Sequence, residues 1–264
     1  MRKNILVVGC SFSHHSKNSY NGNDIKQNSW VDCLSDELNK ELYVCNISLP
    51  GASNELIKRM VTKKTLEQKW DYVIIQWSTI DRWDYPISLD EHPMFVRYWP
   101  NGSNLGQKNE HFYNHYYSVY GAVIDTLENI LFTQQLLDSE NIPYSMITIG
   151  NLFTLSTTIK QIKNLMDSGG DYYGLQENVL EKMERMQTIF EDTNSLPFLL
   201  KKINYEKFLF TDDIRNPMGG GMLEWLYKEK NQYPKNNWHF DAEQSYSFYN
   251  EFIKPKILIP NGLI

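Results

Sequence analysis

The stretch Asn4–Ser13, NILVVGCSFS, decides the fold of this chain. Four aliphatic residues in a row, Ile5–Val8, predict a strand that is buried on both faces, and such strands are typical of parallel sheets. Gly9 then lets the backbone turn sharply, which places Ser11 at the carboxyl end of a first parallel strand. Open α/β sheets bind their ligands at this edge, so Ser11 occupies a position suited to chemistry. Taken alone, Gly-x-Ser is better explained as an ordinary polar turn after a strand.

Strand-like and helix-like segments alternate along much of the chain. Short apolar runs predict further strands, and apolar residues at helical spacing predict the helices between them. This order makes a parallel sheet with right-handed crossover connections. Ser53, just before the second helix, is a good N-terminal cap. The expected strands are Ile5–Val8, Leu42–Ile47, Tyr72–Gln76, Pro143–Ile149 and Phe208–Phe210, and the expected helices are Ser29–Leu38, Asn54–Lys69, Ser118–Glu140, Leu175–Phe190 and Asp241–Ile253.

The segment 82–115 interrupts this alternation. It is rich in Pro, His, Trp and Tyr, which predicts a long irregular insertion above the carboxyl edge of the sheet. Residues 151–205 are predicted to be mostly helical. We therefore expect one domain over residues 1–264, a three-layer α/β/α sandwich with a parallel sheet of about five strands. In this domain 82–115 forms a lid and 151–205 a helical insertion.

Composition and charge narrow the class of function. The 264 residues carry a net charge of −6 and no basic block, so we expect no nucleic-acid partner. No apolar stretch approaches the roughly 20 residues of a membrane span, and the apolar run near the start is too short for a signal peptide. We therefore expect no membrane partner and a cytoplasmic or virion-associated location. Cys10, Cys33 and Cys45 lack metal-ligand spacing and are expected to be reduced and mostly buried.

Two further residues match the needs of ester hydrolysis by a serine. A serine nucleophile needs a positioned base, usually His, and donors that stabilise the oxyanion. His239 lies in a loop just before the closing helix and is the best candidate base. Gly51 follows the second strand and exposes a backbone N–H at a helix start, which suits an anion. Taken singly, a structural histidine and a turn glycine explain these two residues as well.

Together these segments resemble the SGNH (GDSL-type) hydrolase family of esterases, lipases and carbohydrate O-deacetylases. Residues 9–13 resemble the nucleophile block, Gly51 the oxyanion glycine, residues 73–81 the third block, and His239 the base of the last block. With Gln-Trp-Ser at the third strand and Gly-x-Ser-Asn in the second block, the chain is most similar to the variant SGNH proteins of tailed bacteriophages. The resemblance implies the flavodoxin-like fold of this family and an ester substrate, above all an O-acyl (O-acetyl) group on a carbohydrate. We expect no cofactor and no metal.

Three positions depart from the family pattern. Cys10 replaces the usual Asp of the first block, whose side chain is not the nucleophile. Ile80 stands where the third block has an Asn that donates to the oxyanion, and Asn54 is the candidate substitute. Loss of one oxyanion donor costs about 2.7–4 kcal/mol of transition-state stabilisation. Asn236 replaces the Asp that lies three residues before the base, so it orients a neutral imidazole without stabilising the imidazolium by charge.

Residues at and beyond the end of the third strand are candidate substrate contacts, namely Trp77, Ser78, Asp81 and Trp83. Packing of a lid explains the aromatic ones equally well. The first functional hypothesis is a serine esterase acting on a small-molecule or glycan ester, with Ser11, His239 and Asn236 as catalytic residues and Gly51 and Asn54 at the oxyanion. The second is an inactive SGNH-like module that binds a glycan or serves as a virion structural protein, with a homo-oligomer left open. A flavodoxin-like nucleotide-binding protein and a Cys10 nucleophile are weaker alternatives.

Overall fold

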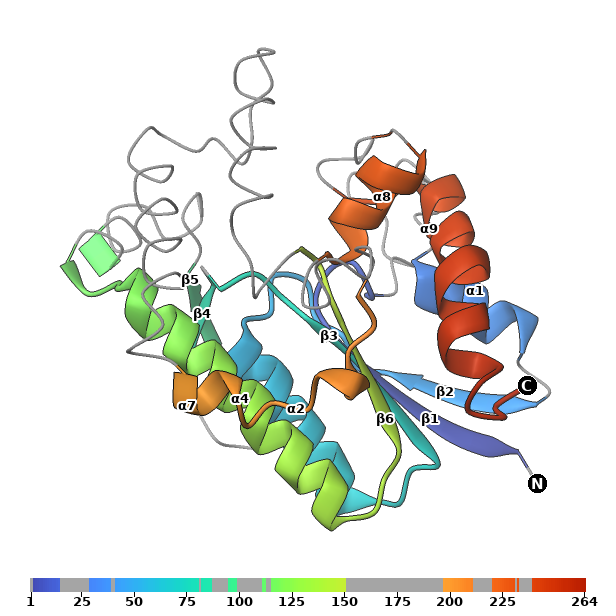
Figure 1. Cartoon of the computed structure of the whole chain (residues 1–264), viewed down its shortest axis with the longest axis horizontal. Coiled ribbons are helices and arrows are strands. Elements are labelled where there is room, and N and C mark those ends of the chain that lie inside the picture. Colours follow the sequence, from blue (N-terminus) through green and yellow to red (C-terminus); the bar gives the residue numbers. More distant parts are fainter. Residues whose placement is uncertain are drawn as a thin grey trace.

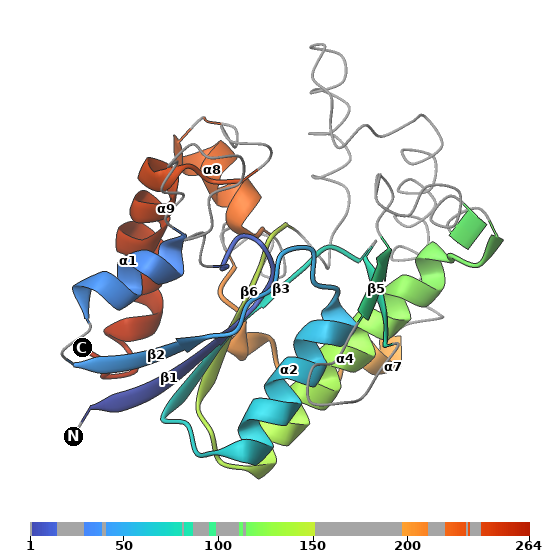
Figure 2. The same ribbon diagram turned by 180° about the vertical axis from the view of Figure 1, so that it is seen from behind.

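The structure is a computed structural model that describes residues 2–14, 29–38, 41–80, 82–86, 95–98, 111–112, 115–150, 197–210, 220–230, 232 and 239–264. A parallel sheet lies at the centre, and helices cover both of its faces (Figures 1 and 2). The two ends of the chain lie close to each other at the edge of the sheet where its strands begin. This arrangement confirms the predicted three-layer α/β/α sandwich.

Four strands form the central sheet, namely β1 (Lys3–Val8), β2 (Leu42–Asn46), β3 (Tyr72–Trp77) and β6 (Tyr144–Thr148). They pair in the order β2-β1-β3-β6, and every pairing in the sheet is parallel. The chain therefore adds strands first on one side of β1 and then on the other. In an open sheet of this order, the carboxyl ends of β1 and β3 flank the switch point where ligands bind.

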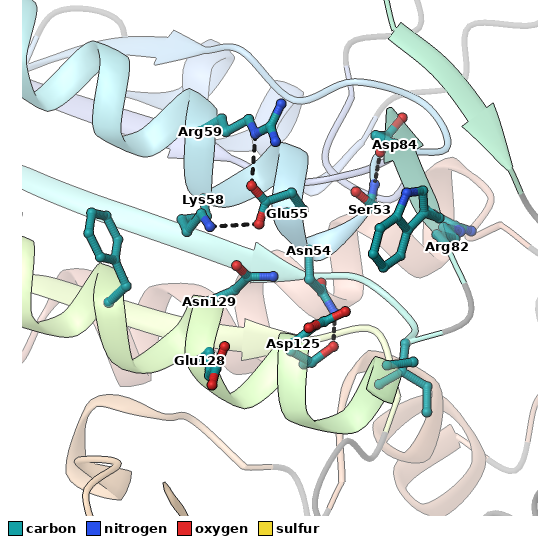
Figure 3. A pocket seen from close by; sticks show the side chains of 15 residues that line it. Ser53, Asn54, Glu55, Lys58, Arg59, Arg82, Asp84, Asp125, Glu128 and Asn129 are labelled. Atoms are coloured by element: carbon teal, nitrogen blue, oxygen red, sulfur yellow. Dashed lines mark hydrogen bonds and ion pairs between the residues drawn. The ribbon is translucent and has the colours of Figure 1, made fainter. Parts of the chain in front are cut away.

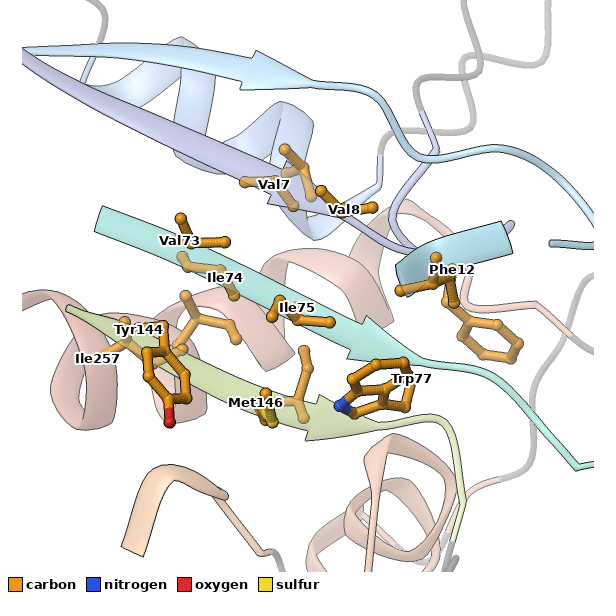
Figure 4. Close-up of a cluster of buried hydrophobic side chains, with 14 of the residues drawn as sticks. Val7, Val8, Phe12, Val73, Ile74, Ile75, Trp77, Tyr144, Met146 and Ile257 are labelled. Atoms are coloured by element: carbon orange, nitrogen blue, oxygen red, sulfur yellow. The ribbon is translucent and has the colours of Figure 1, made fainter. Parts of the chain in front are cut away.

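Burial on both faces explains why the inner strands are continuous apolar runs. Ile5–Val8 of β1 and every residue of β3 are buried. Of the two edge strands, β6 is buried throughout, whereas β2 is mostly half-buried. Figure 4 shows this core, in which side chains from β1, β3 and β6 pack together and against Ile257. Each fully buried aliphatic side chain contributes about 1.5–3 kcal/mol relative to an exposed one. The core therefore holds the strand ends, and the turns that follow them, in fixed positions.

The helices divide between the two faces of the sheet. On one face α2 (Asn54–Glu67) packs along α4 (Val119–Ser139), with the short α7 (Pro197–Leu200) beside α4 (Figures 1 and 2). On the other face α1 (Trp30–Glu37) packs against α9 (Ala242–Phe248) and against the π-helix η2 (Tyr249–Leu258). The last helix of the chain thus lies on the same face as the first.

Side-chain caps fix where three of these helices begin. The Ser53 hydroxyl accepts a hydrogen bond from the backbone N–H of Leu56, which confirms the predicted cap of α2. Asp241 forms a reciprocal capping box with Gln244 at the start of α9. Ser29 does the same for α1. A cap of this kind is worth about 0.5–2 kcal/mol, and here the cap of α9 sets the end of the His239 loop.

Some predicted elements change in the structure. Phe208 forms an isolated parallel bridge with Met146, so within the described ranges the sheet has four strands and not five. The segment 82–115 is not wholly irregular, because β4 (Trp83–Pro86) and β5 (Phe95–Tyr98) pair as an antiparallel ribbon. Helix α8 (Met222–Lys230) has no counterpart among the predicted elements. The predicted helix Leu175–Phe190 lies outside the described residues, as do 151–196 in general.

No helix within the described ranges combines the length and the apolar character needed to cross a bilayer.

Candidate active site

The turn that carries Ser11 follows directly from the end of β1. The backbone N–H of Ser13 donates to the carbonyl of Cys10 at 3.1 Å, which closes the turn. Ser11 is partly exposed, whereas Cys10 and Ser13 are fully buried. A Cβ atom at Gly9 would lie only 2.9 Å from the Cβ of Gln76. Glycine at this position therefore lets β1 and β3 approach closely just below the turn.

A buried polar network holds this turn from below. The Gln76 amide accepts a hydrogen bond from the Ser13 hydroxyl at 2.7 Å and donates to the Cys10 sulfur at 3.3 Å. The Trp30 indole N–H from α1 donates to the same Ser13 hydroxyl at 3.1 Å. Gln76 and Ser13 are both fully buried, so water does not compete for these bonds. The network links β1, β3 and α1, and Ser11 stays partly exposed, with its hydroxyl 3.9 Å from the Cys10 sulfur.

The loop after β2 is tied to the same turn. The Asn46 side chain donates to the carbonyl of Ser13 at 2.6 Å, and the His14 ring nitrogen Nδ1 lies 2.7 Å from the carbonyl of Ser48. The backbone N–H of Leu49 donates to the carbonyl of Gly9 at 3.1 Å. These contacts bring the predicted oxyanion loop beside the predicted nucleophile turn. Gly51 follows in this loop with φ of 74°, a left-handed conformation that favours glycine.

Asn54, the candidate substitute for the missing oxyanion donor, is buried at the start of α2. One N–H of its amide donates to the Thr126 hydroxyl of α4 at 3.1 Å, and its oxygen accepts from the backbone N–H of Ser78 at 2.8 Å. The residue is only 3% exposed, so these two bonds fix its orientation. The second amide N–H is the donor that remains for a ligand. Asn54 also joins the end of β3 to α4, which is a structural role in its own right.

His239 lies against the turn that carries Ser11, although 228 positions separate the two residues in sequence. Its ring centroid is 5.0 Å from that of Phe12, the residue after Ser11. Phe240, next in the chain, packs edge-on against the same Phe12 ring at 5.6 Å. The capping box of Asp241 then begins α9 directly after this pair. The fold therefore brings the predicted base loop and the predicted nucleophile turn into contact through Phe12.

The remaining predicted site residues lie in different surroundings. Trp77 is fully buried in the core, so its ring face does not meet solvent, where a substrate would stack. Ser78 is also fully buried, and its hydroxyl accepts from the Arg82 guanidinium at 2.9 Å. Trp83 is 39% exposed. Asp81 and Asn236 lie outside the described residues.

Sequence reasoning missed the supporting residues Gln76, Ser13 and Arg82. Gln76 left a signal, since it is the one amide in the otherwise apolar strand Tyr72–Trp77. A polar side chain in a strand buried on both faces needs a partner, and its position near the strand end points to the turn beyond it. Ile80 is half-buried against the core and brings no polar group to the site. Cys10 is fully buried with its sulfur against Gln76, which does not suit an attacking thiolate.

Comparison with known proteins finds similar chains among solved structures. No protein-family model matches the chain, and no curated protein matches it. Among solved structures, a catalytic mutant of the acetylxylan esterase Axe2 from Geobacillus stearothermophilus is similar at 13% identity, with 96% of this chain and 93% of that chain covered and a TM-score of 0.46. A putative GDSL-like lipase from Parabacteroides merdae is similar at 13% identity, with coverage of 100% and 98% and a TM-score of 0.46. The acetyl xylan esterase AlAXEase is similar at 12% identity, with coverage of 96% and 100% and a TM-score of 0.43. At these scores the likeness does not assign an activity.

Proposed function

We propose that this protein is a serine hydrolase that cleaves an ester bond, with Ser11 as the nucleophile and His239 as the general base. The supporting observation is the 5.0 Å contact between the His239 and Phe12 rings, which brings two distant segments together at the carboxyl edge of a parallel sheet. Both residues come from positions that resemble the matching SGNH blocks. The partly exposed Ser11 above a rigid buried network suits a residue that must meet a substrate.

In the proposed reaction, Ser11 Oγ attacks the carbonyl carbon of the ester while His239 takes the hydroxyl proton. The backbone N–H groups of Ser11 and Gly51 and the second amide N–H of Asn54 stabilise the oxyanion. When the intermediate collapses, the leaving alcohol takes the proton from His239, and the acyl group stays on Ser11. A water molecule deprotonated by His239 then attacks the acyl carbon, which releases the carboxylic acid and restores the serine. Asn236 or a backbone carbonyl orients the imidazole in this proposal.

For the substrate, we propose an O-acyl group, above all O-acetyl, on a carbohydrate. The family resemblance supports this class, and the exposed Trp83 supplies an apolar ring of the kind that packs on a sugar face. Neighbouring solved structures include acetylxylan esterases, which are named for such substrates. The residues of the second block (Gly-x-Ser-Asn) and of the third block (Gln-Trp-Ser) further support a relationship to the variant SGNH proteins of tailed bacteriophages. This relationship in turn supports a cytoplasmic or virion-associated location.

A second candidate function is an SGNH-like module that binds without catalysis, as a virion part or a homo-oligomer. Ile80 at the position of the donor Asn favours it, because an isoleucine cannot stabilise an oxyanion. The bond from Asn54 to Thr126 favours it as well, since it uses one of the two amide protons of the proposed substitute. Without a working donor, the rate would fall by about 10²–10³.

Hydrolysis of 4-nitrophenyl acetate by the purified protein separates these candidates. The control is Ser139→Ala, since Ser139 is exposed at the end of α4 and its hydroxyl bonds only the carbonyl of Leu136. We expect the native protein and Ser139→Ala to hydrolyse the ester at equal rates, and Ser11→Ala to fall to the rate of buffer. A fluorophosphonate probe should add one adduct to the native protein and none to Ser11→Ala, as measured by mass spectrometry. Equal rates for Ser11→Ala and the native protein would refute the proposal.

A further inference from the structure

A concave site lies between α2 and α4, and Ser11 is not among the residues that line it. It is a cleft of about 580 Å³, a size within the usual range for small-molecule sites. Figure 3 shows that its walls come from the first turns of α2, from α4 and from β4. Neither Ser11, Gly51 nor His239 lines it. Asn54 and Trp83 do, so the cleft begins where the proposed oxyanion loop ends.

Asn129 of α4 is a buried amide that faces this cleft without a partner. The residue is only 5% exposed, and its side chain lines the cleft and points toward α2 (Figure 3). Throughout the part of the chain that the structure describes, no hydrogen bond reaches this amide, and only the Asn129 backbone carbonyl is used, by Thr133. A buried amide normally has a partner, because leaving it unsatisfied is costly. An amide kept in this state is suited to a ligand that completes its hydrogen bonds.

Asp125 lies one turn before Asn129 and lines the same cleft. The two residues are four apart on one helix, so their side chains are neighbours on one face. Burial, followed by the charges of Glu128 and Glu55, raises the pKa of the Asp125 carboxyl above its ordinary value. No ion pair to Asp125 is present among the described residues. Asp125 therefore offers acceptor oxygens that a hydrogen-bond donor on a ligand would satisfy.

The cations that line the cleft are already engaged. Lys58 and Arg59 both bond the carboxylate of Glu55, at 2.6 and 2.8 Å, and Arg82 bonds the Ser78 hydroxyl at 2.9 Å. An anionic ligand would therefore meet Asp125 before it met an available cation. A ligand with only donors, such as an ammonium group, would leave the Asn129 N–H groups unpaired and would lie beside Lys58. A hydroxyl both donates and accepts, so a pair of hydroxyls matches a carboxylate next to an amide.

We propose that this cleft binds a neutral saccharide, with Asp125 accepting from one hydroxyl and Asn129 bonding its neighbour. Trp83, which is 39% exposed and lines the cleft, packs on the apolar face of the sugar ring. The inference shares Trp83 with the proposed ester substrate and goes beyond that proposal in Asp125 and Asn129, which are neither nucleophile nor base. It holds equally for a module without catalysis.

Titration of the full-length protein with neutral sugars tests the proposal by tryptophan fluorescence and saturation-transfer NMR. The panel contains glucose, xylose, N-acetylglucosamine, cellobiose, xylobiose, maltose and lactose, with spermidine and citrate as the charged probes. We expect saturable binding of at least one sugar and none of spermidine or citrate. Asn129→Leu and Asp125→Asn should each weaken sugar binding at least about tenfold, because each removes one side of the hydroxyl pair. Gln135→Ala, on an exposed position of the same helix that does not line the cleft, should bind as the native protein does.

Thermal melting distinguishes a variant that has lost sugar binding from one that has lost its fold. Asn129→Leu removes an unpartnered buried amide, so its Tm should equal or exceed that of the native protein. Absence of saturable binding by the whole sugar panel would overturn the proposal, and so would binding of spermidine or citrate in place of sugars. Sugar binding that survives both Asn129→Leu and Asp125→Asn unchanged would also overturn it. Ser11→Ala should bind sugar normally, so failure of the hydrolase proposal and failure of the cleft proposal give different results.

Discussion

The hydrogen bond between Ser13 and Gln76 offers the sharpest test of how the fold positions Ser11. Gln76→Leu removes the acceptor of the Ser13 hydroxyl, a 2.7 Å bond between two fully buried side chains. A buried donor left without an acceptor costs about 1–3 kcal/mol. Ser13→Ala should cost a similar amount, because it leaves both the Gln76 oxygen and the Trp30 indole N–H unsatisfied. For a chain of this size, each kcal/mol lowers Tm by about 2–4 °C.

The double variant Ser13→Ala, Gln76→Leu separates a specific bond from general loss of packing. When both partners become apolar, neither leaves the other's polar group unpaired, and only the Trp30 indole N–H, which loses its acceptor with Ser13, stays unsatisfied. The double variant should therefore be about 1 kcal/mol more stable than the sum of the single effects predicts. Urea denaturation measures the free energies of unfolding for the four proteins in this cycle. The matched control pairs Gln76→Leu with Thr133→Val, since Thr133 is a fully buried hydroxyl whose bond stays within α4. That pair should be additive within about 0.5 kcal/mol.

The same variants connect the network to the proposed chemistry. A turn that shifts by about 1 Å loses up to about 10² in rate, so Gln76→Leu should lower hydrolysis of 4-nitrophenyl acetate while leaving Ser11 in place. The Thr133→Val control should keep the native rate. Strict additivity of Ser13→Ala and Gln76→Leu in stability, together with an unchanged rate for Gln76→Leu, would refute the reasoning that this bond holds the turn.

Three further predictions follow from individual contacts. Asp241→Ser keeps the cap of α9 and should hydrolyse ester within about twofold of the native rate, as measured by 4-nitrophenol release. A rate lower by about 10⁴ would contradict this expectation and would identify Asp241 as the carboxylate that orients His239. Gly221→Ala would place a Cβ atom 2.5 Å from the carbonyl oxygen of Thr148, so a urea titration should show a loss of about 1–3 kcal/mol, and an unchanged midpoint would contradict that contact. Burial, and then the charge of Asp32, raise the pKa of the Cys33 thiol from 9.0 to about 11. Folding therefore favours the neutral thiol, so the stability this group adds is full below pH 9.0 and is lost as pH rises through about 11. The rate of iodoacetamide labelling of Cys33, followed by mass spectrometry, should have its midpoint near pH 11, and a midpoint near 9.0 would contradict the burial effect.

The elements that could be predicted from the sequence are those whose signal is local. Ile5–Val8 and residues 72–75 are buried on both faces of the sheet, so the sequence there is a continuous apolar run. The caps at Ser53 and Asp241 are equally local, because a cap involves residues only three positions apart. The ribbon of β4 and β5 could not be predicted from the sequence, since its stability comes from pairing between two segments and not from a pattern within either one. For the same reason, Phe208 carried a strand signal and yet reaches the sheet through a single bridge.

For the site, the order of segments predicted more than any single residue did. Ser11 and His239 are each ambiguous alone, yet a parallel sheet collects the loops after its strands at one edge, which is where Phe12 and His239 meet. The residues that hold these loops were harder to predict, because a buried polar side chain shows its role only through its partner. Gln76 is the example: its place in an apolar strand indicates a constraint, and only the structure identifies Ser13 as its cause.

The buried polar side chains of helix α4 differ in whether the folded chain supplies them with a hydrogen-bond partner. Four polar side chains lie buried on it, namely Thr126, Asn129, Thr133 and Gln134. Thr126 accepts from Asn54, Thr133 donates to the helix backbone, and Gln134 makes two bonds of 2.9 Å to the backbone of Asn204. Each of these three has a structural explanation within the folded chain. Asn129 lacks one among the described residues, and it is the one that faces a cleft with a carboxylate four residues away. This difference between Asn129 and the other three side chains is the observation on which the proposed saccharide site rests, and Asn129→Leu is the variant that tests it.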